Sequence, residues 1–239
     1  MTEALYHADS YLREFNATII GVMDNGIMLD RTAFYPGGGG QPNDVGVLKA
    51  GGLEYNVVKV GRKDGEILHE VDGPMLTSGT AVTGVIDWER RYALMRTHTA
   101  LHILCGVIWR TYGSQVTGGN MQPLQARIDF ELERMSADFA EEVERLANDE
   151  IAAARDISAQ VLPRADAFAI PDLIRTKINL LPEGITEVRV LDIKGLDIQA
   201  DGGTHVANTR EVGWIKVVGH ESKGRINKRL RIAVEPAAS

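Results

Sequence analysis

Apolar residues in the first part of the chain fall into short runs that turn signals separate at close intervals. The runs at 16–22 and 55–60 have the length and the β-branched content of strands. Three turn signals punctuate this region, at Asp24-Asn25-Gly26, Gly51-Gly52 and Lys63-Asp64-Gly65. We therefore expect residues 1–90 to form a small β-barrel, because closure satisfies the edges of many short strands.

From residue 89 onward the apolar positions recur at the spacing of a helix. The stripe consists of Leu94, Leu101, Leu104 and Ile108, and Gly113 is placed to end the helix. A second helix is predicted from Ser136, a favourable N-cap, with its apolar face at Phe139, Val143, Leu146 and Ile151. Strands are expected at 126–131, 157–162, 185–193, 196–199, 213–218 and 229–234, and a short helix that Pro171 interrupts at 165–177. Residues 91–239 are therefore predicted to be an α+β domain with helices set against a mainly antiparallel sheet.

Composition places the chain among ordinary soluble proteins. Of its 239 residues, 44% are hydrophobic and 25% are charged, which is close to average. There is no apolar run of about eighteen residues, as a membrane helix needs, and the N-terminus lacks the pattern of a signal peptide. The single cysteine, Cys105, excludes an internal disulfide. We expect a soluble cytoplasmic protein without membrane association, and no obligate protein partner is indicated.

The charge is unevenly distributed. The net charge of -7 argues against nonspecific coating of nucleic acid. The segment from residue 214 to residue 235, however, contains six basic residues and only two acidic ones. This segment either binds phosphates or is a solvated edge strand, whose lysines prevent it from pairing with other chains.

Four consecutive glycines, Gly37 to Gly40, precede Gln41. Such a run is costly in backbone entropy, so it is either a flexible tip or a place where backbone approaches another group closely. It lacks the Lys-Ser/Thr ending of a nucleotide P-loop, and no helical pattern follows it. Nucleotide binding is therefore not expected, and the residues alone favour a flexible tip.

His98 and His102 stand four residues apart in the first helical run. Residues at this spacing lie on one helix face about 6 Å apart, so two imidazoles can share one divalent metal. By itself this spacing is more often accidental than functional. Thr99, rather than glutamate, follows His98, which excludes the metallopeptidase motif with its general base. Cys105 lies a full turn beyond His102, and we interpret it as a small buried side chain.

A second pair of ligand-type residues, Asp201 and His205, flanks a Gly-Gly turn after a predicted strand. Zinc accepts imidazole nitrogen and carboxylate oxygen, and a tight turn can direct both side chains to one point. Each pair is weak evidence alone. Together, a helix pair and a strand-end pair predict one metal site.

Three separated motifs carry a family resemblance, and they are Gly38-Gly39-Gly40-Gln41, Arg96-Thr97-His98-Thr99-Ala100-Leu101-His102 and Gly202-Gly203-Thr204-His205-Val206. They resemble the AlaX family, free-standing relatives of the editing domain of alanyl-tRNA synthetase, over nearly the whole chain. The size and glycine motif are similar to the AlaX-M type. The resemblance implies a translation-factor-like barrel over 1–90 and a zinc-bearing editing domain over 91–239. It also implies a zinc-dependent hydrolase that removes serine, and glycine, from mischarged tRNA(Ala).

For the centre, the resemblance implies one Zn²⁺ held by His98, His102 and His205, with Asp201 beside it. Family members commonly have cysteine where this chain has Asp201. The carboxylate keeps the formal charge of a thiolate but is a harder donor, so the site is less selective for zinc. Asp201 is either a ligand or a general base. The metal either activates water and polarises the ester carbonyl or holds the aminoacyl amino group while free water attacks.

The resemblance also implies a substrate pocket. Gln41 corresponds to a position that contacts aminoacyl adenosine, and we expect the backbone of Gly38, Gly39 and Gly40 to approach the substrate. A loop at 113–122, which contains Gly118-Gly119-Asn120, is expected to close the other side. Candidates for recognising the serine hydroxyl are Gln41, Asn120 and Thr204, and the residues expected to touch the acceptor-stem phosphates of tRNA are Lys223, Arg225, Lys228 and Arg229.

Two alternatives remain open. A site in which four residues occupy the metal would favour a non-catalytic tRNA-binding module with a structural zinc. A related editing domain could instead act on another aminoacyl-tRNA, such as the threonyl type.

Overall fold

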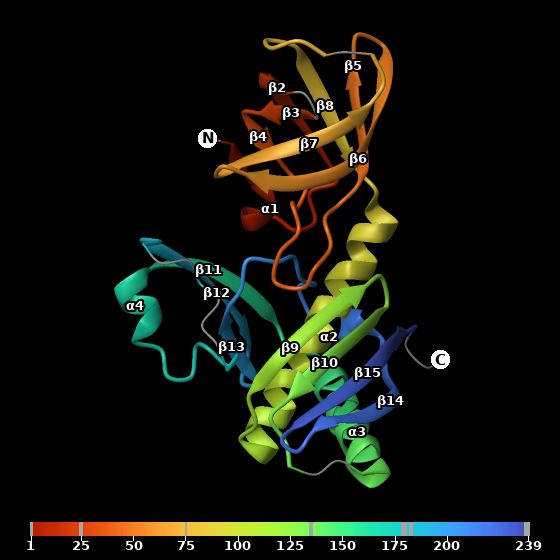
Figure 1. Cartoon of the computed structure of the whole chain (residues 1–239), viewed down its shortest axis with the longest axis vertical. Helices are drawn as coiled ribbons and strands as arrows, with labels where there is room; N and C mark the ends of the chain where they lie inside the picture. Colours follow the sequence, from red (N-terminus) through yellow and green to blue (C-terminus); the bar gives the residue numbers. More distant parts are fainter. Residues whose placement is uncertain are drawn as a thin grey trace. The chain divides into compact units, whose positions relative to one another are not determined.

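The computed structural model describes residues 2–23, 26–74, 76–133, 136–177, 181 and 184–236. Two residues of an expected turn, Asp24 and Asn25, lie outside the described residues. The chain divides into two compact units, Met1–Ala93 and Leu94–Ser239 (Figure 1). In the part of the chain that the structure describes, no helix has both the length and the apolar character that crossing a bilayer requires.

The first unit contains the expected barrel, closed in the strand order β2-β3-β7-β6-β5-β8. Its elements are β1 (Glu3–Ala4), α1 (Leu5–Ala8), β2 (Glu14–Met23), β3 (Gly26–Leu29), β4 (Arg31–Thr32), β5 (Gly46–Ala50), β6 (Leu53–Lys63), β7 (Glu66–Asp72) and β8 (Ala81–Ile86). Ile19, Leu29 and Leu48 fill the interior and are almost fully buried. Gly51-Gly52 and Asp64-Gly65 join neighbouring strands with positive φ at both residues, as the tightest hairpin turns require. The prediction of a barrel is confirmed.

The glycine run forms a regular turn instead of a loose tip. Gly38 and Gln41 exchange two backbone hydrogen bonds, at 3.0 and 2.9 Å. Between them, Gly39 and Gly40 have φ of 58° and 87°, a conformation that is costly for residues with a Cβ. The side chain of Gln41 is only 2% exposed.

A buried ion pair holds the two ends of this segment. Asp44 accepts a hydrogen bond of 2.6 Å from the backbone N–H of Tyr35. The guanidinium of Arg91, which is fully buried, donates from Nε to both Asp44 carboxylate oxygens at 3.0 and 2.9 Å. The hydroxyl of Tyr35 then donates to the carbonyl of Gly38 at 3.1 Å. The shape of the turn is thus fixed by tertiary contacts as well as by its glycines.

The second unit is α+β, as predicted. Its elements are most of α2 (Trp88–Tyr112), then β9 (Val116–Gln122), β10 (Gln125–Phe130), α3 (Ala137–Ala152), β11 (Ile157–Pro163), α4 (Arg164–Phe168), β12 (Glu187–Ile193), β13 (Asp197–Ala200), the 3₁₀ helix η1 (Thr209–Val212), β14 (Trp214–Gly224) and β15 (Asn227–Glu235). The strands form two antiparallel sheets, β14-β15-β10-β9 and β11-β12-β13.

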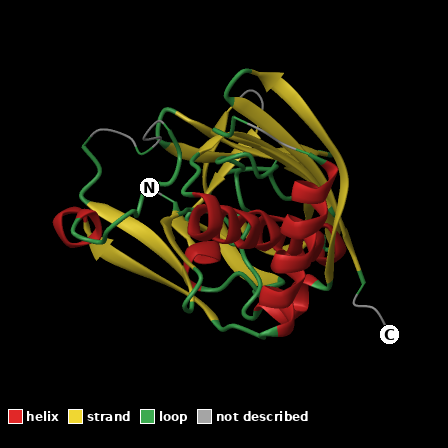
Figure 2. Ribbon diagram, turned by 90° about the horizontal axis from the view of Figure 1, so that it is seen from below, coloured by secondary structure: helices red, strands yellow, loops and turns green. Residues whose placement is uncertain are grey.

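Local signals explain where the helices of this unit begin and end. Gly113, with φ of 62°, follows the last residue of α2, as expected. The Ser136 side chain accepts a hydrogen bond of 3.2 Å from the N–H of Phe139 and caps α3. Asn148 of α3 then bonds the backbone N–H and C=O of Ile215, at 2.9 and 2.8 Å. This side chain attaches α3 to strand β14. Helices are red and strands yellow in Figure 2.

Two expected elements are wrong. The helix expected at 165–177 ends at Phe168, because Pro171 provides no N–H and disfavours helical geometry in the residue before it. The loop expected at 113–122 is mostly strand β9, which pairs with β10 in spite of its two glycines. Its backbone hydrogen bonds to β10 override the low strand propensity of Gly118 and Gly119.

Candidate metal centre

Helix α2 places His98 and His102 on one face, one turn apart. Their ring centroids are 5.2 Å apart, and the residues are only 4% and 8% exposed. Both imidazoles are therefore presented by a rigid element in a nearly dry environment.

The second pair comes from the turn that follows strand β13. The carboxylate of Asp201 accepts a hydrogen bond of 2.7 Å from the N–H of Gly203. Arg189 of β12 donates to the carbonyls of Asp201 and Gly203, at 3.1 and 3.0 Å. The backbone N–H of Asp201 in turn bonds the Arg189 carbonyl at 3.0 Å. These contacts fix the turn, so Asp201 and His205 point in a defined direction.

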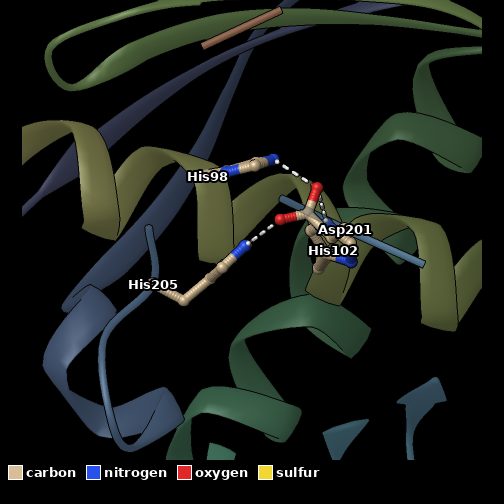
Figure 3. Close-up of side chains that lie close together, drawn as sticks. All are labelled: His98, His102, Asp201 and His205. Carbon is tan, nitrogen blue, oxygen red and sulfur yellow. Dashed lines mark hydrogen bonds and ion pairs between the residues drawn. The ribbon is translucent and has the colours of Figure 1, made fainter. Parts of the chain in front are cut away.

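The four side chains converge on one point, with the Asp201 carboxylate among the three imidazoles (Figure 3). Its Oδ1 lies 2.8 Å from His205 Nε2, and its Oδ2 lies 3.5 Å from His98 Nε2 and 3.7 Å from His102 Nε2. One potential ligand atom from each residue lies within 4.8 Å of all the others. The ligand atoms of a tetrahedral zinc are about 3.3 Å apart, so this donor set fits one divalent metal after small adjustments.

Burial and mutual contacts shift the pKa values of these groups in different directions. Burial lowers the pKa of His98 well below its usual value and that of His205 to about 4. Burial also acts to lower the pKa of His102, but Asp197 and Asp201 outweigh it and raise this pKa to about 9. Burial acts to raise the pKa of Asp201, whereas the neighbouring histidines bring it well below its usual value. One negative charge and one protonated imidazole therefore coexist in the cluster at neutral pH.

Three supporting residues were missed in the sequence, namely Thr99, Asp197 and Gln199. The Thr99 hydroxyl lies 3.3 Å from His205 Nδ1, and Asp197 accepts from His102 Nδ1 at 3.0 Å. Gln199 donates to Asp197 at 2.6 Å. A signal for two of them was present, because Asp197 and Gln199 alternate along β13 toward Asp201, and polar residues on the buried face of a strand need partners.

Cys105 lies near this cluster but is not part of it. It is 4% exposed, accepts a hydrogen bond of 3.2 Å from Gln199, and burial raises the pKa of its thiol. The prediction of a small buried side chain is confirmed.

The remaining candidates for the substrate pocket occupy three different places. Thr204 lies in the turn between Asp201 and His205 and is fully buried. Asn120 is an exposed residue of β9, opposite Arg127 of β10. Gly38 to Gln41 belong to the first compact unit.

The four basic residues expected to bind tRNA differ in their surroundings. Lys223 and Arg225 are exposed near the turn between β14 and β15. Lys228 is 5% exposed, and its ammonium donates to the carbonyls of Gly224 and Arg225 at 2.7 and 3.0 Å. Arg229 donates to both oxygens of Asp129, at 2.6 and 2.8 Å. The side chains of Lys228 and Arg229 are thus already bonded to groups of the protein itself.

The fold and the site together agree with families of tRNA-synthetase domains. Residues 4–90 match the family model for tRNA synthetases class II (A). Residues 188–231, which contain Asp201 and His205, match that for the threonyl and alanyl tRNA synthetase second additional domain.

Relatives that match over nearly their whole length identify the family within this class of tRNA-synthetase domains. The chain is 42% identical to the alanyl-tRNA editing protein AlaX-M of Methanosarcina barkeri, over 96% of this chain and 98% of that protein. It is also 42% identical to the AlaX-M of Saccharolobus solfataricus, over 99% of this chain and all of that protein. The alanine–tRNA ligase of Pyrococcus furiosus is 39% identical over 92% of this chain but only 24% of its own length. The chain belongs to the AlaX-M family of alanyl-tRNA editing proteins.

Binding of a divalent metal such as zinc to this cluster is predicted to release about one proton per ion at pH 7. A ligand nitrogen must be deprotonated before it binds a metal, and His102, with its pKa raised to about 9, is protonated at this pH. His205, with its pKa lowered to about 4, is already neutral. Zinc affinity should therefore rise with pH up to about 9 and then level off.

Calorimetric titration in buffers of different ionisation enthalpy measures this proton release directly. Release of no proton at pH 7, or of two, would contradict the charge state derived for the cluster.

Proposed function

We propose that this protein is a zinc-dependent trans-editing enzyme that hydrolyses the ester of serine, or of glycine, wrongly attached to tRNA(Ala). The observation that carries the proposal is the convergence of four ligand-type side chains, of which the three histidines are buried and Asp201 is half-buried. It occurs in a chain whose full-length relatives are named alanyl-tRNA editing proteins. Membership of the family supports tRNA(Ala) as the substrate, and the four ligand-type side chains support the requirement for a metal.

In this proposal His98, His102 and His205 hold the metal through their Nε2 atoms. When bound, a divalent ion supplies positive charge that attracts either the ester carbonyl oxygen or the aminoacyl amino group. The helix and the turn contribute fixed geometry, which holds the scissile ester in one orientation. The three nearly buried imidazoles also provide a low-dielectric environment, in which such attraction is stronger.

We assign Asp201 as a ligand, in preference to a general base. Its carboxylate lies among the three Nε2 atoms, and Oδ1 already accepts hydrogen bonds from His205 and Gly203. An efficient general base has a pKa near the working pH, whereas the pKa of Asp201 is held well below its usual value. Low basicity and central position both support the ligand role.

Substrate recognition is assigned to the glycine turn and to three polar side chains. We propose that Gly38, Gly39 and Gly40 present backbone to the aminoacyl end and that Gln41 contacts the adenosine. Thr204 and Asn120 are candidates for pairing with the serine hydroxyl, since a site built to bond a hydroxyl discriminates against a substrate that lacks it. Glycine has no hydroxyl, so its hydrolysis rests on the family resemblance alone.

Chelation is predicted to abolish the hydrolysis of mischarged tRNA. Serine-, glycine- and alanine-charged tRNA(Ala) are incubated with the protein, with and without a chelator, and the surviving aminoacyl-tRNA is measured. We expect rapid loss of the serine and glycine esters, survival of the alanine ester, and return of activity when zinc is restored. Serine and glycine esters that persist at the uncatalysed rate would refute the proposal.

The replacement Asp201→Asn is predicted to weaken zinc binding, whereas Asp201→Cys is predicted to preserve it. Asparagine keeps the acceptor for Gly203 but loses the charge, so we expect affinity to fall at least about ten-fold. Cysteine supplies the thiolate that family members commonly have here and should retain tight binding. Competition with a chromogenic chelator measures both dissociation constants. Unchanged affinity in Asp201→Asn, together with lost hydrolysis, would instead assign Asp201 as a base.

A second candidate function is a tRNA-binding module in which the zinc is structural. The observation in its favour is that Asp201 and three histidines together complete a tetrahedral donor set, which is typical of closed sites. The same incubation separates the two functions, because a binding module would retain the charged tRNA without hydrolysing it. The same incubation with threonine tRNA that carries serine tests the other alternative, because an editing domain of the threonyl type would hydrolyse this ester.

Phosphate binding by the hairpin is predicted to depend on Lys223 and Arg225. We expect their double replacement by alanine to weaken tRNA binding and to flatten the plot of log affinity against log salt by about 0.7–0.9 per lost contact. Replacing Lys59 and Arg145, whose side chains are each 62% exposed, removes the same charge elsewhere and serves as the control. Equal salt slopes in the wild type and the hairpin variant would remove the hairpin from the tRNA interface.

A further inference from the structure

Each imidazole that binds a metal through Nε2 must keep its hydrogen on Nδ1. A neutral histidine carries one ring hydrogen, and the partner of Nδ1 decides which nitrogen has it. Two histidines of the cluster have a specific partner at Nδ1, and these partners come from different elements of the fold. Neither partner contributes one of the four candidate ligand atoms.

Asp197 is the nearest partner of His102 Nδ1, at 3.0 Å, and the Gln199 amide nitrogen lies farther away at 3.4 Å. An ionised carboxylate only accepts hydrogen bonds, so it requires the hydrogen on Nδ1 and leaves the Nε2 side for a metal. The carboxylate is itself held in place, because Gln199 donates to Oδ2 at 2.6 Å and Arg175 pairs with Oδ1 at 3.0 Å. Its side chain is only 1% exposed, so it cannot turn toward water.

Thr99 is the Nδ1 partner of His205, at 3.3 Å. Its hydroxyl oxygen also accepts a hydrogen bond from the N–H of Val206 at 3.3 Å. That bond fixes the oxygen relative to the backbone beside His205, and one lone pair of the oxygen remains for the Nδ1 hydrogen. Thr99 is fully buried, so water cannot compete for this lone pair.

We propose that Asp197 and Thr99 are positioning residues that accept the Nδ1 hydrogens of His102 and His205 when a divalent cation occupies the site, so that each Nε2 atom can give up its hydrogen and bind the cation. This inference rests on the proposed metal site. It assigns to Thr99 a role at the position where a metallopeptidase helix has its glutamate. Helix α2 then provides two ligands and the support for a third.

The replacements Thr99→Val and Thr99→Ser test the hydroxyl. Valine has nearly the same shape but no acceptor, so we expect the zinc dissociation constant to rise about 10–100-fold. Serine restores the hydroxyl and should restore affinity. Chelator competition gives the constants, and the zinc-free thermal unfolding of each variant shows that it is folded. A valine variant that binds zinc as tightly as wild type would overturn the role of Thr99, as would a serine variant as weak as valine.

The replacement Asp197→Asn tests the carboxylate. The amide can present N–H to Nδ1 and favour the wrong tautomer, so zinc affinity should again fall about 10–100-fold. Glu150→Gln is the matched control, because Glu150 is also a buried carboxylate and pairs with Arg110 and Arg155. We expect both variants to unfold at lower temperature but only Asp197→Asn to bind zinc more weakly. Equal zinc affinities in the two variants would overturn the role of Asp197.

The wild-type titration separates this inference from the proposed function. Wild-type zinc binding and hydrolysis with unaltered affinity in the variants would overturn the positioning roles and leave the function intact. Absence of zinc binding by the wild type would overturn both. Cobalt provides an independent readout, because the intensity of its visible absorption reports whether the ligands remain tetrahedral in each variant.

Discussion

The main electrostatic constraint on the second unit is a half-buried carboxylate, Asp201, that lies among three buried imidazoles. Removing ionisable groups from water costs several kcal/mol for each ion unless opposite charge and hydrogen bonds compensate. Within the chain, His102 provides this compensation, because its raised pKa of about 9 keeps it cationic beside Asp201. A divalent cation offers the same compensation with greater charge. The protonated imidazole of His102 therefore compensates the carboxylate within the chain, and in the proposed metal site the cation would take over this part.

The polar residues around the cluster follow from the same constraint. Arg175 neutralises Asp197, so the carboxylate that orients His102 adds no net charge near the centre. Arg189 binds the carbonyls of Asp201 and Gly203 and so holds the turn without contacting its carboxylate in the hydrogen bonds described. These two arginines therefore hold Asp197 and the backbone of the turn, while the Asp201 carboxylate contacts Gly203 and the histidines.

The sequence predicted what short-range rules control. The spacing of His98 and His102, the cap at Ser136 and the end of α2 at Gly113 were all readable, because each depends on neighbouring residues. The partners of Thr99 and Asp197 were not, since they are set by packing between segments about 100 positions apart. Strand β9 was mistaken for a loop for the same reason, because its pairing with β10 outweighs its two glycines. The expectation of a mischarged tRNA as substrate came from the three-motif resemblance, because no local pattern in the sequence indicates a substrate.

The assignment of Asp201 also determines which kind of chemistry the site can perform. A four-residue donor set leaves little room for water on the metal, and Thr99 replaces the glutamate that would act as a base on α2. Catalysis in such a site must rely on positioning the ester and on stabilising charge as it develops. An ester is easier to hydrolyse than an amide, so the proposed reaction places a smaller demand on a general base. The proposed ligand site would suit this kind of catalysis, because helix α2 and the hydrogen-bonded turn at Asp201 hold its side chains in place before a substrate binds.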